Sequence, residues 1–135
     1  MHFSLIDRVL EREDDRLVAV KMVSNAEEYL RDHFPTFPVL PGVMMIEALV
    51  QASRELLGAG DRWVLREVKA LKYGSFVKPG ESLLVEVVVA KRGDDGTVTL
   101  KGTGTRRSEG AEDAVAVSGR VVLGPVSVWS GVSGP

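Results

Sequence analysis

The chain has 135 residues, of which 17 are basic and 19 acidic, and its formal net charge is −2. This length suits one domain with a proper hydrophobic core, and the balanced charge argues against a general nucleic-acid-binding protein. The absence of cysteine excludes disulfides, thiolate metal ligands and a cysteine nucleophile. No apolar run approaches the ~20 residues of a membrane span, and the N-terminus lacks the pattern of a signal peptide. We therefore predict a soluble cytoplasmic protein, without a membrane span or a nucleic-acid partner.

Alternating apolar residues in the first part of the chain predict two strands. Residues 3–10 form the first predicted strand and residues 17–23 the second. The charged segment 11–15 between them is predicted to be a hairpin tip. Residues 24–27, Ser-Asn-Ala-Glu, match a capping box and predict a short helix that ends near Arg31.

A long apolar helix is predicted over residues 41–57. Pro41 suits the first helical turn, where its missing N–H is not needed, and Gly58 can supply the left-handed stop. Glu47 is the only polar residue between positions 43 and 50. A helix that is apolar on nearly every side is expected to lie in the middle of a protein. A carboxylate there is costly unless it is paired or used.

The rest of the chain is predicted to be strands. They cover residues 63–73 (with an irregularity near Ala70), 82–92, 97–107 and 114–123. Turns are predicted at 78–81, 93–96 and 108–113. The glycines of 97–107 suggest a bulge or a close backbone approach. The expected product is an α+β domain of five or six largely antiparallel strands around one helix, over residues 1–123, followed by an irregular tail at 124–135.

Strand 82–92 is apolar on more than one side. In so small a protein this suggests a dimer interface. The alternative is that the strand is simply deeply buried.

One extended motif resembles a known family. His33-Phe-Pro, the run Pro38-Val-Leu-Pro-Gly-Val43, Ile46-Glu-Ala48 and Gln51 closely match the active-site signature of FabZ-type β-hydroxyacyl-[acyl carrier protein] dehydratases. Ile6-Asp-Arg-Val-Leu-Glu11 also resembles the first strand of that family, and Phe76-Val-Lys-Pro-Gly-Glu81 its Val-x-Pro-Gly-Asp turn. The resemblance therefore covers most of the chain. It implies a hotdog fold, in which an antiparallel sheet wraps around a long central helix.

His33 and Glu47 are a candidate acid–base pair. Histidine exchanges protons near neutral pH, and the apolar surroundings of Glu47 are expected to favour its protonated, proton-donating form. Gln51, one turn further, can orient the carboxyl of Glu47. Gly42 stands at the helix start, where free N–H groups favour developing negative charge.

The resemblance assigns roles to these residues. It implies that His33 removes the C2 proton of a (3R)-hydroxyacyl thioester, that Glu47 protonates or positions the leaving hydroxyl, and that the Gly42 N–H polarises the carbonyl. The residues predicted to contact the substrate are Gly42, Gln51, Val39 and Phe37, with Phe37 at the entrance for the acyl chain. Thr36 and Phe37 depart from the family, which usually has glycine after His-Phe-Pro.

The resemblance also implies the partners. They are an acyl carrier protein bearing a 3-hydroxyacyl chain and a second copy of the chain, in a homodimer with shared active sites; a trimer of dimers is also open. No cofactor and no metal is predicted. The basic residues Lys69, Lys72, Lys78, Lys91, Arg92, Arg106 and Arg107 could steer an acidic carrier, or be ordinary solvated charges. Two other functions stay open: a hotdog acyl-thioesterase, and an acyl-binding homologue without turnover.

Overall fold

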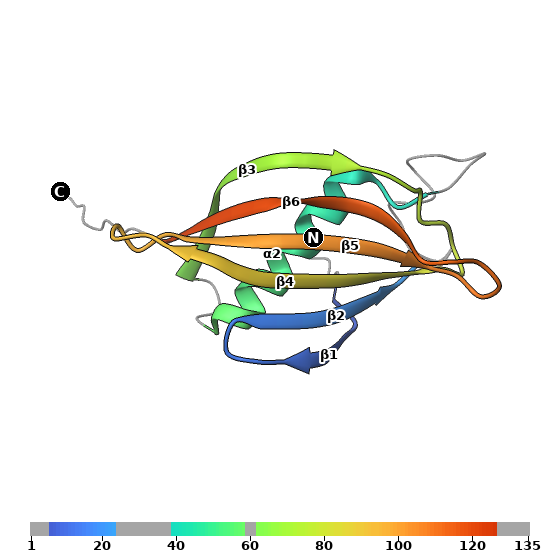
Figure 1. Cartoon of the computed structure of the whole chain (residues 1–135), viewed down its shortest axis with the longest axis horizontal. Helices are drawn as coiled ribbons and strands as arrows, with labels where there is room; N and C mark the ends of the chain where they lie inside the picture. The colour runs from blue at the N-terminus through green and yellow to red at the C-terminus, as the bar shows by residue number, and fades with distance from the viewer. Residues whose placement is uncertain (1–5, 24–38, 59–61, 127–135) are drawn as a thin grey trace.

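The structure is a computed structural model that describes residues 6–23, 39–58 and 62–126. In these residues six strands form one antiparallel sheet with the order β1-β2-β4-β5-β6-β3. The strands are β1 (Arg8–Arg12), β2 (Arg16–Met22), β3 (Trp63–Tyr73), β4 (Ser82–Arg92), β5 (Val98–Arg107) and β6 (Ala114–Pro125). Helix α2 (Gly42–Leu57) lies in the hollow of the curved sheet (Figure 1). None of the described helical segments has the length and apolarity needed to cross a membrane.

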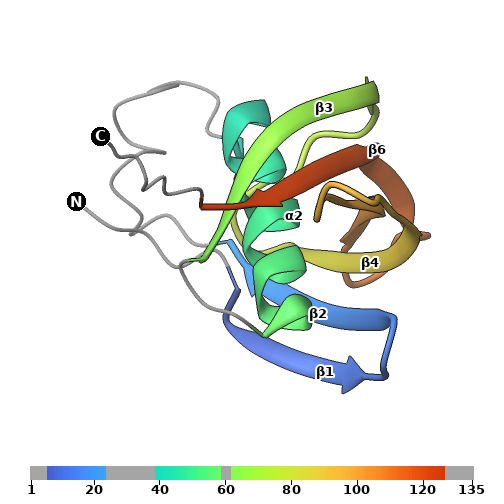
Figure 2. The ribbon, with the colours of Figure 1, turned by 90° about the vertical axis from the view of Figure 1, so that its left-hand side faces the viewer.

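Figure 2 shows the sheet curling around α2, from β1 on one side to β3 on the other. This is the predicted arrangement of a sheet wrapped around a central helix. The two outermost strands are β1 and β3, so the sheet does not close into a barrel and both of these strands have an edge without a strand partner in the described chain.

Local signals place both ends of α2. Pro41 precedes the helix with φ −64° and ψ 148°, and its carbonyl accepts hydrogen bonds from Met44 and Met45. Gly58 ends the helix in the left-handed region, with φ 76°, and donates its N–H to the carbonyl of Arg54. A residue with a β-carbon would be strained at that φ, so glycine suits the position. The predicted helix stop at Gly58 is confirmed.

The core lies between α2 and the concave face of the sheet. A β-carbon at Gly102 of β5 would approach Leu49 of α2 to 3.1 Å, so the glycine allows the helix to lie close to the sheet. The predicted close approach at the β5 glycines is thus confirmed. Large, fully buried side chains from the helix and five other segments fill this space: Leu17, Leu49, Val50, Val77, Leu83, Val85, Val87, Leu100, Val117 and Leu123.

Strand β3 contains the expected irregularity. Its register against β6 shifts between Lys69 and Lys72. Ala70, in this interval, has φ 54°, a left-handed conformation that is uncommon for residues other than glycine. The two observations together identify a β-bulge, which bends the strand locally.

The predicted bounds of β1 and β6 are wrong, while those of β2 and the start of β5 differ by one residue. β1 runs from Arg8 to Arg12, so its end takes in part of the predicted hairpin tip, while residues 6 and 7 are not strand and residues 3–5 lie outside the described chain. Pairing with β2 explains the shift, because Glu11 and Arg12 lie opposite Val18 and Leu17. β6 continues to Pro125 rather than stopping at Leu123, because Pro125 pairs with Trp63 of β3. The predicted short helix at 24–31 lies outside the described residues.

The suggestion that strand 82–92 forms a dimer interface is not supported by its position. β4 pairs with β2 from Ser82 to Val88 on one side and with β5 from Ser82 to Arg92 on the other. Leu83, Val85 and Val87 are fully buried on the helix side, whereas residues between them are only half-buried. The alternative, deep burial, therefore holds for the helix side of β4 only, and a role of its other face between two chains stays a prediction.

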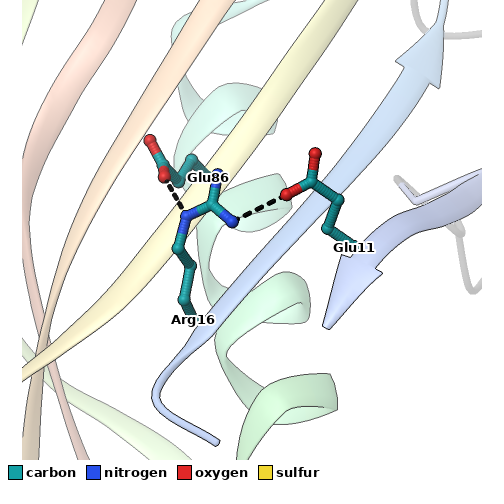
Figure 3. Close-up of polar contacts among 3 residues, drawn as sticks. All are labelled: Glu11, Arg16 and Glu86. Carbon is teal, nitrogen blue, oxygen red and sulfur yellow. Dashed lines mark hydrogen bonds and ion pairs between the residues drawn. The ribbon is translucent and has the colours of Figure 1, made fainter. Parts of the chain in front are cut away.

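Three charged residues link neighbouring strands on the convex face (Figure 3). Arg16 of β2 contacts Glu86 of β4 at 2.6 Å and Glu11 of β1 at 2.7 Å. These hydrogen bonds raise the pKa of Arg16 above its ordinary value. The guanidinium of Arg16 therefore links the three neighbouring strands β1, β2 and β4.

Replacing Arg16 by methionine should lower the urea concentration at the unfolding midpoint, because Glu11 and Glu86 lose their shared cation. The loss should shrink at high salt, since ions screen partly exposed pairs. Urea unfolding at low and high salt measures both effects. Arg92→Met is the matched control, because Arg92 makes one longer contact, 3.4 Å to Asp15, and both side chains are more exposed. Equal losses in the two variants would contradict the role given to Arg16.

Candidate active site at the start of the helix

A cavity of about 440 Å³ lies at the N-terminal end of α2. Its volume is in the range of small-molecule sites. The helix and the residues before it contribute one wall, and the end of β3 with the residues after it contributes another. The lining residues are Val39, Leu40, Pro41, Gly42, Met45, Tyr73, Gly74, Ser75, Phe76 and Ala116. Most of these side chains are apolar, which suits a hydrocarbon chain.

Backbone hydrogen bonds hold the two walls together. Leu40 donates its N–H to the carbonyl of Val77 at 2.8 Å, which joins the segment before α2 to the segment after β3. Gly74 and Ser75 donate to the carbonyls of Ala116 and Val115 of β6, at 2.8 and 2.9 Å. The cavity is thus built from parts of the chain that are at least 28 residues apart in sequence, joined by the sheet.

Gly42 and Val39 both line this cavity, where they were predicted to meet the substrate. Gly42 is the first residue of α2, and the first N–H groups of a helix have no partner within the helix. Val39 is 5% exposed. Both residues can therefore touch a molecule bound in the cavity. Their roles toward a substrate stay predictions.

Tyr73 is the site residue that the sequence analysis missed. It is the last residue of β3, and its ring covers Gly42 so closely that a β-carbon there would lie 2.8 Å from the Tyr73 hydroxyl. The only signal in the sequence is an aromatic residue at a strand end, next to Gly74 and Ser75. That signal is weak, because the contact joins residues 31 positions apart and depends on the sheet.

Glu47 and Gln51 lie on another side of α2. At about 100° per residue, Glu47 is roughly 200° around the helix from Met45, which lines the cavity. The Gln51 Nε2 lies 3.4 Å from the Glu47 Oε2, so the expected contact between them is present, although long. Arg54 adds a cation, with its Nη1 3.9 Å from the same oxygen. Its Nε donates to the carbonyl of Trp63 at 2.9 Å, which helps to hold it beside Glu47.

The expectation that α2 is enclosed on every side is wrong for the single chain. The Glu47 side chain is 45% exposed and Val43 is 67% exposed. The sheet covers only one face of the helix, because it curls around α2 without closing. The face that carries Glu47 therefore remains accessible on this chain.

The first part of the motif, residues 33–38, which includes His33, Thr36 and Phe37, lies outside the described residues. The described chain holds no group of three or more His, Asp or Glu side chains that could bind a metal. Among the basic residues considered for steering a carrier, Arg92, Arg107 and Lys69 lie within 4.0 Å of a carboxylate. Those three fit the interpretation as ordinary surface charges.

Comparison with known proteins gives the family. Residues 9–111 match the ApeI-like family, described as ApeI dehydratase. The chain belongs to the ApeI-like dehydratase family. Dehydratases are hydro-lyases, so this ApeI-like protein is an enzyme of that class, and the predicted resemblance is confirmed.

Relatives of this ApeI-like dehydratase carry the name 3-hydroxyacyl-[acyl-carrier-protein] dehydratase FabZ. The protein of Solibacter usitatus is 38% identical over 96 residues, which are 67% of this chain and 59% of that relative. The protein of Lactococcus lactis subsp. cremoris is 35% identical over 75% of this chain and 81% of its own length. The protein of Thermotoga petrophila is 31% identical over 90% of this chain and 86% of its own length.

Solved structures support the hotdog fold of the ApeI-like dehydratase. The dehydratase heterocomplex ApeI:P from Xenorhabdus doucetiae aligns with a TM-score of 0.67 and 19% identity, over 90% of this chain and 98% of that one. Thioesterase superfamily member 2 from Mus musculus aligns with a TM-score of 0.66 and 15% identity, over 88% and 80%. At these identities the likeness concerns the fold alone.

Proposed function

We propose that this protein dehydrates (3R)-3-hydroxyacyl thioesters carried on an acyl carrier protein, forming trans-2-enoyl thioesters for fatty-acid or related acyl-chain synthesis. The observation that carries the proposal is the apolar cavity that ends at Gly42, the first residue of α2. The apolar lining of this cavity can contact a hydrocarbon chain, and the N–H groups at the helix N-terminus can bind a carbonyl oxygen. The names of the FabZ relatives supply the substrate class. We place the reaction in the cytoplasm, in keeping with the cysteine-free composition.

The chemistry requires a base, an acid and stabilisation of negative charge. His33, neutral at the start, removes the proton from C2, and the electron pair forms the C2–C3 double bond as the C3–O bond breaks. Glu47 gives a proton to the departing hydroxyl, which leaves as water. The Gly42 N–H stabilises the negative charge that builds on the thioester oxygen. Proton exchange with solvent then resets His33 and Glu47.

We infer that two chains build each site. Glu47 lies on a different side of α2 from the cavity of its own chain, on an exposed face. A second chain can bring its Glu47 to this cavity if it adds along the edge strand β3. That strand has 11 residues and exposes Leu65, Leu71 and Tyr73 by 39%, 37% and 52%. A long, partly apolar edge strand favours pairing with another strand. A dimer and a trimer of dimers both satisfy this arrangement.

Incubation with a 3-hydroxyacyl-[acyl carrier protein] tests the proposed reaction. The absorbance of an enoyl thioester should rise while free thiol stays constant. Release of free thiol would instead identify a thioesterase, and binding without either product would identify an acyl-binding protein that has lost turnover. Either outcome would overturn the proposed dehydration.

Mixing two inactive variants tests the shared site. His33→Ala and Glu47→Gln should each be inactive alone, but co-expressed chains should recover about a quarter of wild-type activity, since half of randomly paired dimers are mixed and each has one intact site. The measurement is dehydration by the purified mixture, with each variant alone as the control. If both residues of a site came from one chain, no mixed dimer would hold an intact site, and the mixture would stay inactive.

A further inference from the structure

We propose that the Tyr73 hydroxyl donates a hydrogen bond to the thioester carbonyl oxygen of the substrate, beside the N–H of Gly42. Tyr73 would then touch the group on which negative charge develops. The inference rests on the proposed dehydration, and it adds a substrate-contacting residue that the motif around His33 and Glu47 does not contain.

The positions of Tyr73 and Gly42 carry the inference. The Tyr73 hydroxyl, Cζ and Cε1 lie 2.8, 2.8 and 2.9 Å from the point where a Gly42 β-carbon would be. A bond from Cα to that point is ~1.5 Å long, so the hydroxyl lies within about 4.3 Å of the Gly42 Cα and within about 5.8 Å of its nitrogen. Two donors no farther apart than that can both reach one oxygen at ~2.9 Å.

The composition of the cavity makes a second donor useful. Its lining side chains are apolar except for the hydroxyls of Tyr73 and Ser75. A carbonyl oxygen that enters such a space loses its hydrogen bonds to water, which is costly unless the protein replaces them. The hydroxyl of Tyr73 is directly beside the helix start, so it can act together with the Gly42 N–H on one oxygen.

The backbone holds Tyr73 in this place. Tyr73 pairs with Val117 of β6, and the next two residues donate hydrogen bonds to Ala116 and Val115 of the same strand. A side chain at Gly74 would collide with the Val115 carbonyl, so glycine lets the chain stay close to β6 immediately after Tyr73. A donor fixed before the substrate arrives costs little reorganisation during the reaction, which is the requirement for stabilising a developing charge.

Tyr73→Phe tests the inference because it removes the hydroxyl and keeps the ring over Gly42. We expect kcat to fall by about 10²-fold with KM little changed, since the hydrogen bond strengthens as charge builds on the oxygen. Thermal unfolding should stay as in the wild type. Thr103→Val is the control: it removes a hydroxyl from β5 beside Gly102, on the sheet face turned away from α2, and should leave kcat unchanged.

Infrared spectroscopy distinguishes a hydrogen bond to the substrate from a purely structural role of Tyr73, because only the hydrogen bond changes the carbonyl stretch of the bound thioester. The carbonyl stretch of a bound saturated acyl thioester should lie at lower frequency in the wild type than in Tyr73→Phe, because a hydrogen bond weakens the C=O bond. An unchanged frequency, or a Tyr73→Phe effect confined to KM, would overturn the inference. If the wild type forms no enoyl product, the proposed reaction fails by itself, and the frequency measurement still decides whether Tyr73 contacts the carbonyl.

Discussion

Glu47→Gln should lower kcat for dehydration by about 10²–10⁴-fold while the protein stays folded, because glutamine keeps the shape of the side chain but cannot give a proton to the leaving hydroxyl. The amide can still contact Gln51, whose Nε2 lies 3.4 Å from the carboxyl oxygen in the wild type. Stopped-time assays of enoyl product, with thermal unfolding measured on the same preparations, separate chemistry from stability.

The same helix offers a matched control for this prediction. Glu55 is also on α2, with a side chain 56% exposed and an ion pair to Arg12 at 2.9 Å. Glu55→Gln makes the same substitution on the same element, so any general effect of replacing a carboxyl group by an amide on this helix should appear in both variants. If Glu47→Gln were as active as Glu55→Gln, the assignment of Glu47 as the acid would be wrong.

Gly42→Ala should lower kcat/KM by about 10–10²-fold, since displacing a carbonyl by a fraction of an ångström is costly when positioning matters. The new methyl group would lie 2.8 Å from the ring of Tyr73, so either the ring or the start of α2 must move. Alanine is the better helix former, so a loss cannot come from the propensity of the helix. Initial-rate kinetics on the acyl carrier substrate measure the effect.

A double-variant cycle on stability isolates the contact between Gly42 and Tyr73. Gly42→Ala should destabilise the protein by ~1–3 kcal/mol when Tyr73 is present, as overpacking does. In a Tyr73→Ala background the same change should cost far less, because the ring that the methyl group meets is gone. Equal costs in the two backgrounds, measured by urea unfolding, would contradict the close packing of this pair.

Much of the fold could be predicted because its signals are local. The bounds of α2 follow from Pro41 and Gly58, and the exact span of β4 follows from a valine-rich alternation closed by turns. An irregularity near Ala70 was also expected, and the structure shows it to be a bulge. The larger errors fall at β1 and β6, whose ends depend on how far a neighbouring strand continues, and no local pattern contains that information.

The candidate site was predicted only in part. Gly42 and Val39 line the cavity, and Gln51 contacts Glu47 as expected, because their spacing follows from helix geometry. Tyr73 was missed, since its place over Gly42 depends on pairing between β3 and β6. His33 and Phe37 lie outside the described residues, and their roles stay predictions.

The amino-acid sequence by itself determined the elements and the chemistry available to this protein: a helix after Pro41 whose apolar first half carries one acid, a histidine before it in the sequence, and strands on either side of it in the sequence. Those properties depend on neighbours within a few residues, so they can be read locally. Only the tertiary structure decided that the sheet covers one face of α2 and leaves Glu47 accessible. It also decided that β4 is central while β3 forms an edge, and that Tyr73 closes over Gly42. Each of these depends on the order of strands in the sheet, which is set by contacts between distant parts of the chain.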